Sequence, residues 1–368
     1  MARAAMAERK LLVLASKPFG LAPSQRYRLE QWAPHLASEH RIRLDFAPFE
    51  SDRLSELLYQ SGHIPQKALW VIRDFIRRSE VVRRSRAYDA LVIHREASLI
   101  GPAFYETLLA LLGKPIIYDF DDAIWSSDQL TINGAFSRLH FFGKTSRICK
   151  LAAAVTVGND ELADYARRRN AFVTIVPSSI ELADYPEIPE PADRSKFIVS
   201  WSGSTSTLAH FECARGALEQ LAARIPLIVK VISSKPPERA VAGAEMQFVP
   251  WSAQSEAENV GDCHVGIMPL PDNEATRGKG GMKALQYMAT GRPVIVSPVG
   301  VNTRLVRNGH NGFLAQSDEE WIDALLKLQA SAQLRSRLGR NARRLVEDDY
   351  TAETSASKFA AVVDYLLP

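Results

Sequence analysis

The sequence predicts an α/β protein with two Rossmann-like domains. Short apolar or β-branched segments alternate with longer helical patterns, twelve such short segments occur, and a proline-rich stretch interrupts the series once. Strands that alternate with helices form βαβ units, whose parallel sheets are covered on both faces. Because one ordinary Rossmann sheet does not hold twelve strands, we expect two sheets.

The expected strands fall into two series, taken here in chain order. The first series comprises Leu11–Ala15, Ile42–Phe46, Ala90–His94, Pro115–Asp119, Ala153–Val157 and Phe172–Val176. The second comprises Phe197–Trp201, Leu227–Ile232, Met246–Val249, Val265–Pro269, Pro293–Ser297 and Gly312–Ala315. Ligands of open α/β sheets bind where such strands end, so the chemistry is sought just after them.

The interruption lies between the two series. Pro177, Pro186, Pro189 and Pro191 prevent this stretch from continuing a helix or a central strand. The end of the chain has apolar positions at helical spacing, which predicts a helix. The expected parts are a domain over residues 1–180, a linker over 181–195, a domain over 196–350 and a C-terminal helix over 351–368.

Composition excludes several classes of protein. The 368 residues are 46% hydrophobic and 24% charged, which excludes a disordered chain or a coiled coil. A net charge of only +3 argues against a dedicated nucleic-acid binder. The three cysteines form neither a disulfide framework nor a CxxC pair. The apolar run Leu11–Ala15 is too short for an export signal, so we expect a cytoplasmic protein, at most peripheral on the inner face of the membrane.

A glycine-containing loop precedes one expected helix of the second half. The loop runs from Arg277 to Lys283, the helix ends at Gly291, and a strand follows Pro293. Helix N–H groups and the positive end of the helix dipole form an anion site, for which a diphosphate is the natural ligand. The candidate donor-binding residues here are Arg277, Lys279, Gly280, Gly281, Met282 and Lys283. The alternative is a helix start with solvated surface cations.

A second loop follows the strand Phe197–Trp201. It reads Ser202-Gly-Ser-Thr-Ser-Thr207, and Gly203, Ser204 and Thr205 are the candidates that line a phosphate pocket. An ordinary strand-to-helix turn with Ser or Thr N-caps would have the same composition.

Beyond these loops, the second half resembles a known family. Gln286-Tyr-Met-Ala-Thr-Gly-Arg-Pro-Val-Ile-Val, followed by Asn308-Gly-His-Asn-Gly-Phe-Leu314, resembles the donor-binding half of glycosyltransferase family 4 over most of residues 195–350. In the first half, Asp89–His94 and Ile116–Asp122 match a subgroup of that family. The resemblance implies a GT-B fold, two Rossmann-like domains facing across a cleft, nucleotide-sugar donors and retention at the anomeric carbon.

The sequence departs from the family pattern at the donor site. The family has two glutamates eight residues apart, where this chain has Gly278 and Gln286. Gln286 can still hydrogen-bond ribose hydroxyls, and Glu274 is the nearby candidate for the missing carboxylate. The family's Arg and Lys after the first donor-domain strand are absent from Ser202–Thr207, and Lys279 and Lys283 would replace their charge. The loop resembles that of a bacterial subgroup with Gly-Lys-x-Gly-x-Lys.

In the first half of the chain, polar residues lie at or near the ends of the expected strands. His94 ends a strand where the family has a histidine that contacts the donor sugar; a histidine satisfied by neighbouring backbone is the alternative. Asp121 and Asp122 are expected to cap a helix that starts at Ala123 or to contact the acceptor. A metal site at Asp119-Phe-Asp-Asp122 is the weaker interpretation. Arg26 opens a helix and is a candidate for phosphate or an anionic acceptor, with a surface arginine as the alternative.

A basic stretch covers Lys67–Arg86. Its seven cations face only Asp74 and Glu80, which gives it a net charge of +5, while the whole chain carries only +3. Apolar residues are interspersed, some of them at helical spacing: Leu69, Trp70, Ile72, Phe75, Ile76 and Val81. Such a helix suits an anionic membrane surface and a lipid-linked acceptor, or it is a solvated basic face.

Together these features predict a retaining glycosyltransferase in bacterial glycan or glycolipid assembly. It would move a sugar from a nucleoside diphosphate donor to a saccharide or lipid-linked hydroxyl, with no metal or further cofactor and no nucleic acid. His94, Lys279 and Lys283 are the expected catalytic groups. The alternatives are a non-catalytic nucleotide-sugar or glycan-binding homologue, prompted by Gly278, and a GT-B-type epimerase. An NAD-type oxidoreductase is disfavoured because no G-x-G-x-x-G follows Leu11–Ala15.

Overall fold

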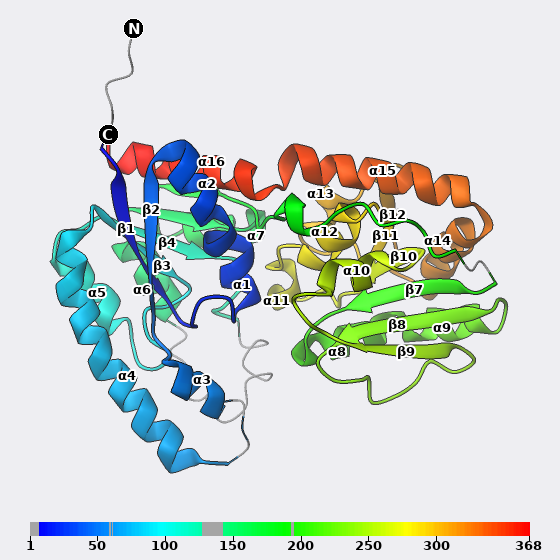
Figure 1. The fold of residues 1–368 in the computed structure, drawn as a ribbon, viewed down its shortest axis with the longest axis horizontal. Coiled ribbons are helices and arrows are strands. Elements are labelled where there is room, and N and C mark those ends of the chain that lie inside the picture. Colours follow the sequence, from blue (N-terminus) through cyan, green and yellow to red (C-terminus); the bar gives the residue numbers. More distant parts are fainter. Residues whose placement is uncertain (1–6, 59, 61, 127–142, 193–194) are drawn as a thin grey trace, which may run out of the picture. The chain divides into compact units, whose positions relative to one another are not determined.

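The computed structural model describes residues 7–58, 60, 62–126, 143–192 and 195–368. The chain forms two compact units (Figure 1). Unit 1 comprises Met1–Ser178 with Ala352–Pro368, and unit 2 comprises Ser179–Thr351. Each unit contains one parallel six-stranded sheet among its described residues, which confirms the α/β class and the prediction of two sheets.

Unit 1 contains the first expected series of strands. They are β1 (Arg9–Ala15), β2 (Ile42–Pro48), β3 (Ala90–His94), β4 (Ile116–Phe120), β5 (Ala154–Val157) and β6 (Val173–Ile175). Their order in the sheet is β2-β1-β3-β4-β5-β6, and all pairs are parallel. Alternate residues of β1 enter different cores, with Leu12 and Leu14 in one and Leu11 and Val13 in the other. Both faces of the sheet are therefore buried, as in βαβ folds.

Helices cover both faces of this sheet. They are α1 (Pro23–Gln25), a π-helical turn (Arg26–Glu30), α2 (Gln31–His40), α3 (Asp52–Leu58), α4 (Ile64–Arg84), α5 (Phe104–Leu111), α6 (Lys144–Leu151), α7 (Asp160–Arg167) and α16 (Ala352–Leu366). The predicted C-terminal helix, α16, packs beside α2, where the rings of Trp32 and Phe359 lie 5.8 Å apart (Figure 1). The last helix of the chain therefore completes the core of the first unit.

Unit 2 contains the second series of strands. They are β7 (Phe197–Ser202), β8 (Leu227–Ser233), β9 (Glu245–Pro250), β10 (Val265–Met268), β11 (Val294–Val296) and β12 (Gly312–Leu314). The order is β12-β11-β10-β7-β8-β9, again with all pairs parallel. Every strand of both units lies within two residues of its expected bounds, including β9, which is largely exposed at the edge of its sheet.

The helices of unit 2 include the one expected after the glycine-containing loop. They are α8 (Leu208–Phe211), α9 (Arg215–Ala222), α10 (Glu256–Gly261), α11 (Glu274–Arg277), α12 (Met282–Ala289), α13 (Asn302–Leu305), α14 (Asp318–Ala330) and α15 (Ala332–Asp349). The stretch predicted as a linker, residues 181–195, falls within unit 2 in this division. Its Tyr185 is only 3% exposed and belongs to the core beside α12.

None of the described helices is long and apolar enough to cross a membrane. The longest of them, α4, has 21 residues and buries Val71, Val81 and Val82 within unit 1. Of the seven cations in the basic stretch, Lys67 and Arg78 are buried as well. The Arg78 guanidinium donates to the carbonyls of Ala47 and Ala15, so it supports strand ends rather than a solvated surface.

Close packing in unit 2 provides a test of the fold. A Cβ at Gly339 of α15 would lie 2.0 Å from the carbonyl oxygen of Gly291. Gly339→Ala should therefore lower the stability of unit 2 by about 1–3 kcal/mol, although alanine normally favours a helix. The midpoint of urea unfolding measures this. Gly216→Ala in α9 is the control, since its Cβ would meet only the movable Asp318 side chain; equal effects of the two changes would contradict the packing.

Candidate functional site

Two loops of unit 2 meet at the carboxyl edge of its sheet. One follows β7 and begins at Gly203, and the other connects β10 to α12 and contains Gly278–Gly281. β7 and β10 are neighbours in the sheet, so both loops lie at the same part of this edge. This is the position where open α/β sheets bind ligands.

The backbone at Gly203 passes close to the side chain of Lys283, which lies in the first turn of α12. A Cβ at Gly203 would lie 2.7 Å from Lys283 Nζ and 2.5 Å from a ring carbon of Trp201, so no larger residue fits. Lys283 Nζ donates to Thr207 Oγ1 at 3.0 Å and lies 4.6 Å from the Trp201 ring centroid. The two loops are thus joined through Lys283.

Three basic side chains influence one another at this place. Burial and repulsion by Lys279 lower the pKa of Lys283 from 10.5 to about 7. Burial and repulsion by Lys279 and Lys283 lower the pKa of His210 to about 4. Both depressions arise first from burial, which penalises a charged group, so a bound anion would stabilise the protonated form of Lys283. Lys279 and Lys283 are called the cation cluster below; His210, with its pKa of about 4, is neutral near pH 7.

The start of α12 adds backbone donors to the same edge. Gly281 is the N-cap, with a left-handed φ of 73°, and a Cβ there would lie 2.3 Å from Leu305 Cδ1. This glycine therefore fixes the turn after Gly280. The N–H groups of the first helical turn, which begins at Met282, have no partner within the helix and carry the positive end of its dipole.

Two predicted residues of the other loop have exposed hydroxyls. Ser204 Oγ lies 2.9 Å from Ser206 Oγ, and Thr205 Oγ1 lies 2.7 Å from Ser234 Oγ. These hydroxyls are held at the mouth of the site and can donate to a ligand's oxygens.

Two other predicted donor residues have partners of their own. Arg277 is bidentate to Asp272, at 2.6 and 3.2 Å, so its charge is balanced. Gln286 is 5% exposed and donates from Nε2 to the Tyr185 hydroxyl, which in turn donates to Glu256. A contact between Gln286 and a ribose would require the side chain to leave Tyr185.

In unit 1, a buried ionic group lies at the ends of β3, β4 and β5. Arg28 is fully buried and bidentate to Asp119, at 2.9 and 2.6 Å. Asp119 also accepts from Thr156 and from His94 Nδ1, at 2.6 and 2.8 Å. Although burial alone would raise it, the pKa of Asp119 is well below its usual range because of Arg28 and His94. The ionised carboxylate requires a proton on His94 Nδ1.

Beyond His94, the network includes Ser24 and Asp121, which are half-buried. His94 is 1% exposed, and its Nε2 lies 3.0 Å from Ser24 Oγ, which donates to Asp121 at 2.5 Å. Asp122 forms an ion pair with Arg95 at 3.4 Å. His94 thus has partners on both ring nitrogens, and Ser24 and Asp121 are the more exposed members of the network.

Other expectations for unit 1 have mixed outcomes. Arg26 opens the helical segment as expected, and its guanidinium lies 4.4 Å from the Tyr27 ring centroid. The expected helix start at Ala123 is wrong: residues 121–126 form bends and a turn, and Asp121 binds Ser24 instead. In the described part of the chain, no group of three or more His, Cys, Asp or Glu residues could hold a metal ion.

His210, Arg28 and Ser24 were not expected as site residues. His210 lies in the short helix α8 directly after the Ser/Thr loop, and only the packing of α8 brings it near Lys283. Arg28 and Ser24 are in the segment noted for Arg26. The π-helical turn that contains Arg28 gave no signal in the sequence, although such turns are frequent at functional sites.

Comparison with protein families gives a match over the part of unit 2 that contains Lys279 and Lys283. Residues 217–331 match the family described as "Glycosyl transferases group 1". A search of curated protein sequences gave no match.

Solved structures match nearly the whole chain. Sucrose-phosphate synthase from Thermosynechococcus elongatus has a TM-score of 0.70 and 15% identity, with 98% of this chain and 99% of that chain covered. HepE of Anabaena in complex with UDP and glucose has a TM-score of 0.63 and 14% identity, covering 97% and 99%. WaaG, a glycosyltransferase involved in lipopolysaccharide biosynthesis, has a TM-score of 0.61 and 14% identity, with 96% of this chain and 99% of that chain covered. The fold is that of the GT-B glycosyltransferases, as expected.

The pKa of Lys283 provides a test of the site. Between about pH 7 and 10.5 the folded protein has released this proton while the unfolded chain retains it, so stability rises with pH. As the pH rises from about 6 to 9, the unfolding midpoint of the wild type should therefore increase relative to that of Lys283→Met. Lys327→Met, at an exposed position of α14, is the control. A difference between wild type and Lys283→Met that stays constant with pH would contradict the depressed pKa.

Proposed function

We propose that this protein transfers a sugar, with retention, from a nucleoside diphosphate-sugar to a hydroxyl acceptor in bacterial glycan or glycolipid assembly. The group 1 glycosyl transferase domain and the GT-B fold support glycosyl transfer. The observation that carries the proposal is the cation cluster at the ligand-binding edge of unit 2, where burial and repulsion by Lys279 lower the pKa of Lys283.

Breaking the glycosidic bond places negative charge on the departing diphosphate. Lys279, Lys283 and the first N–H groups of α12 would stabilise that charge, because fixed donors need not reorganise during the reaction. Gly203, Ser204 and Thr205 would line the phosphate pocket. These groups supply the positive charge that the leaving diphosphate needs, and we therefore propose a reaction without a metal ion.

The acceptor side of the proposal rests on unit 1. Asp121 and Ser24 are the exposed end of the network that includes His94, and Asp122 and Arg26 flank them in the chain. We assign to this group the binding of an acceptor hydroxyl. His94 would act by orienting Ser24, since its own ring is buried.

Nucleotide binding provides the first test of the proposed function. HepE structures contain UDP and UDP-glucose, so UDP is the first ligand, with GDP, ADP, TDP and CMP beside it. A ligand that binds only the folded state raises the unfolding temperature. Lys283→Ala should weaken binding of the selected diphosphate by about 1–3 kcal/mol, the loss of a charged hydrogen bond.

Arg277→Ala is the matched control, because Asp272 already neutralises Arg277. An equal loss of diphosphate affinity in Lys283→Ala and Arg277→Ala would show that Lys283 has no specific role in binding the diphosphate. Binding without turnover would favour the second candidate, a non-catalytic module, which the glycine at position 278 supports because it provides no carboxylate.

We also propose that α4 contacts an anionic membrane surface, where a lipid-linked acceptor would be found. Its aliphatic residues Leu69, Ile72 and Ile76 are 66%, 56% and 64% exposed and follow helical spacing. Five cations of the basic stretch remain exposed beside them: Arg73, Arg77, Arg83, Arg84 and Arg86. Exposed apolar area beside basic residues is typical of helices that lie in a membrane interface.

Vesicle binding tests this surface. Replacing Ile72 by Ser and Arg83 by Glu should reduce association with phosphatidylglycerol vesicles by roughly ten-fold or more, since one basic residue near such a surface contributes about 1 kcal/mol. UDP binding should not change. Arg167→Glu, an exposed arginine of α7, is the control. Undiminished association of the double variant, measured by co-sedimentation, would refute the membrane contact.

A further inference from the structure

A chain of hydrogen bonds in unit 2 ends at the side-chain amide of Gln286. Gln286 is buried, and its Nε2 donates to the Tyr185 hydroxyl at 2.9 Å. The Tyr185 hydroxyl in turn donates to Glu256 at 2.8 Å, and the other carboxyl oxygen of Glu256 accepts from the Trp251 indole N–H at 2.7 Å. The segment that precedes β7, the start of α10 and the second turn of α12 therefore meet at these side chains.

The donor and acceptor roles in this chain follow from its chemistry. A carboxylate oxygen only accepts, so the single proton of the Tyr185 hydroxyl goes to Glu256. The hydroxyl oxygen can then only accept from residue 286. An amide supplies the N–H that this arrangement needs, whereas an ionised carboxylate does not. The pairing with Tyr185 thus accounts for glutamine at position 286, where glycosyltransferase family 4 has glutamate.

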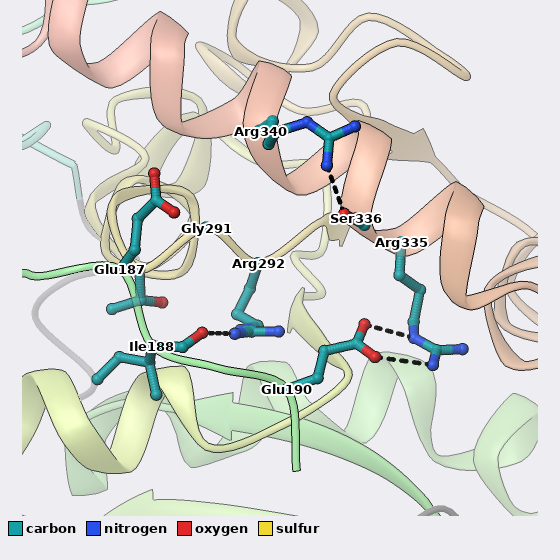
Figure 2. Close-up of a pocket in the computed structure, with 9 residues that line it drawn as sticks. Glu187, Ile188, Glu190, Gly291, Arg292, Arg335, Ser336 and Arg340 are labelled. Atoms are coloured by element: carbon teal, nitrogen blue, oxygen red, sulfur yellow. Dashed lines mark hydrogen bonds and ion pairs between the residues drawn. The ribbon is translucent and has the colours of Figure 1, made fainter. Parts of the chain in front are cut away.

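The backbone around Tyr185 is attached to unit 2. Arg343 of α15 donates to the Tyr185 carbonyl. Figure 2 shows that the following residues are attached as well, since Arg292 donates to the Ile188 carbonyl. Release of the amide therefore requires the Gln286 side chain to rotate away from a stationary Tyr185.

Gln286 lies beside the cation cluster on the same helix. It follows Lys283 by three residues, so the two side chains are neighbours on α12, about 4.5 Å apart along the helix axis. In a nucleoside diphosphate the ribose is attached directly to the diphosphate. A diphosphate at the cation cluster would therefore bring the ribose hydroxyls to the Gln286 amide, once the amide leaves Tyr185.

We infer that Tyr185 determines how strongly the donor site recognises a ribose. The inference rests on the proposed function, because it requires a nucleoside diphosphate at the cation cluster. A ribose hydroxyl gains the Gln286 amide only by replacing the hydrogen bond to Tyr185. Because the two hydrogen bonds contribute about equally, the exchange cancels most of the gain. A phenylalanine at position 185 would remove this competitor, and a bound ribose would then restore a partner that the amide had lost.

Calorimetry with UDP and its 2′,3′-dideoxy analogue tests this inference, because the analogue has the same base and diphosphate without the ribose hydroxyls. Tyr185→Phe in the full chain should raise the affinity for UDP by about three- to ten-fold, the equivalent of one net hydrogen bond. The affinity for the analogue should not change. In a Gln286→Met background, Tyr185→Phe should leave the ratio of the two affinities unaltered. If thermal shifts select another nucleoside diphosphate, that diphosphate and its dideoxy analogue are compared.

Tyr287→Phe is the matched control. It removes another buried tyrosine hydroxyl, which lies 3.1 Å from Ser200 Oγ, and it does so on the helix that carries Gln286. Both variants lose a buried hydrogen bond and some stability in urea, but only Tyr185→Phe should change the ratio of the affinities for UDP and the analogue. An unchanged or lower ratio in Tyr185→Phe, or an equal rise in Tyr287→Phe, would overturn this inference while nucleotide binding persists. No binding of any nucleotide would instead refute the proposed function, and this inference with it.

Discussion

The burial of basic side chains at the carboxyl edge of the unit 2 sheet is the constraint on which the site depends. Lys283 is held below Gly203 by Thr207 and by the Trp201 ring, and any side chain at position 203 would displace it. Burial and repulsion by Lys279 lower the pKa of Lys283, and burial with repulsion by both lysines lowers the pKa of His210. Burial thus penalises the protonated form of Lys283, which a polyanionic ligand would stabilise.

In unit 1, by contrast, the buried charged side chains are paired with one another. Arg28, Asp119 and His94 compensate one another within hydrogen-bond distance, and burial makes this arrangement rigid. The ionised Asp119 fixes the proton on His94 Nδ1, which directs Nε2 to Ser24. The outer residues, Ser24 and Asp121, therefore have a defined orientation although they lie near the surface. A fixed hydroxyl and carboxylate suit recognition of an acceptor hydroxyl, whereas the basic side chains of unit 2 suit a phosphate.

The sequence was sufficient for the sheets because apolar runs bounded by turn residues have one stable arrangement, in which both faces are covered. The glycines also predicted the turn before α12, and the anion site expected there stays a prediction. The sequence did not indicate partners that are distant in the chain. Gln286 meets Tyr185 across about a hundred residues, Arg28 meets Asp119 from another element, and His210 depends on how two loops pack. Asp121, expected as a helix cap, binds Ser24 for the same reason.

Release of nucleoside diphosphate from a nucleotide sugar tests the central claim most directly. The purified chain would be incubated with UDP-glucose and the other common nucleotide sugars, with and without a bacterial glycolipid fraction, and the products followed by mass spectrometry. Glycosyl transfer predicts nucleoside diphosphate and an extended acceptor that appear together, and both should fall in Lys283→Ala. An altered free sugar formed without acceptor, or nucleotide binding with no release under any condition, would contradict it.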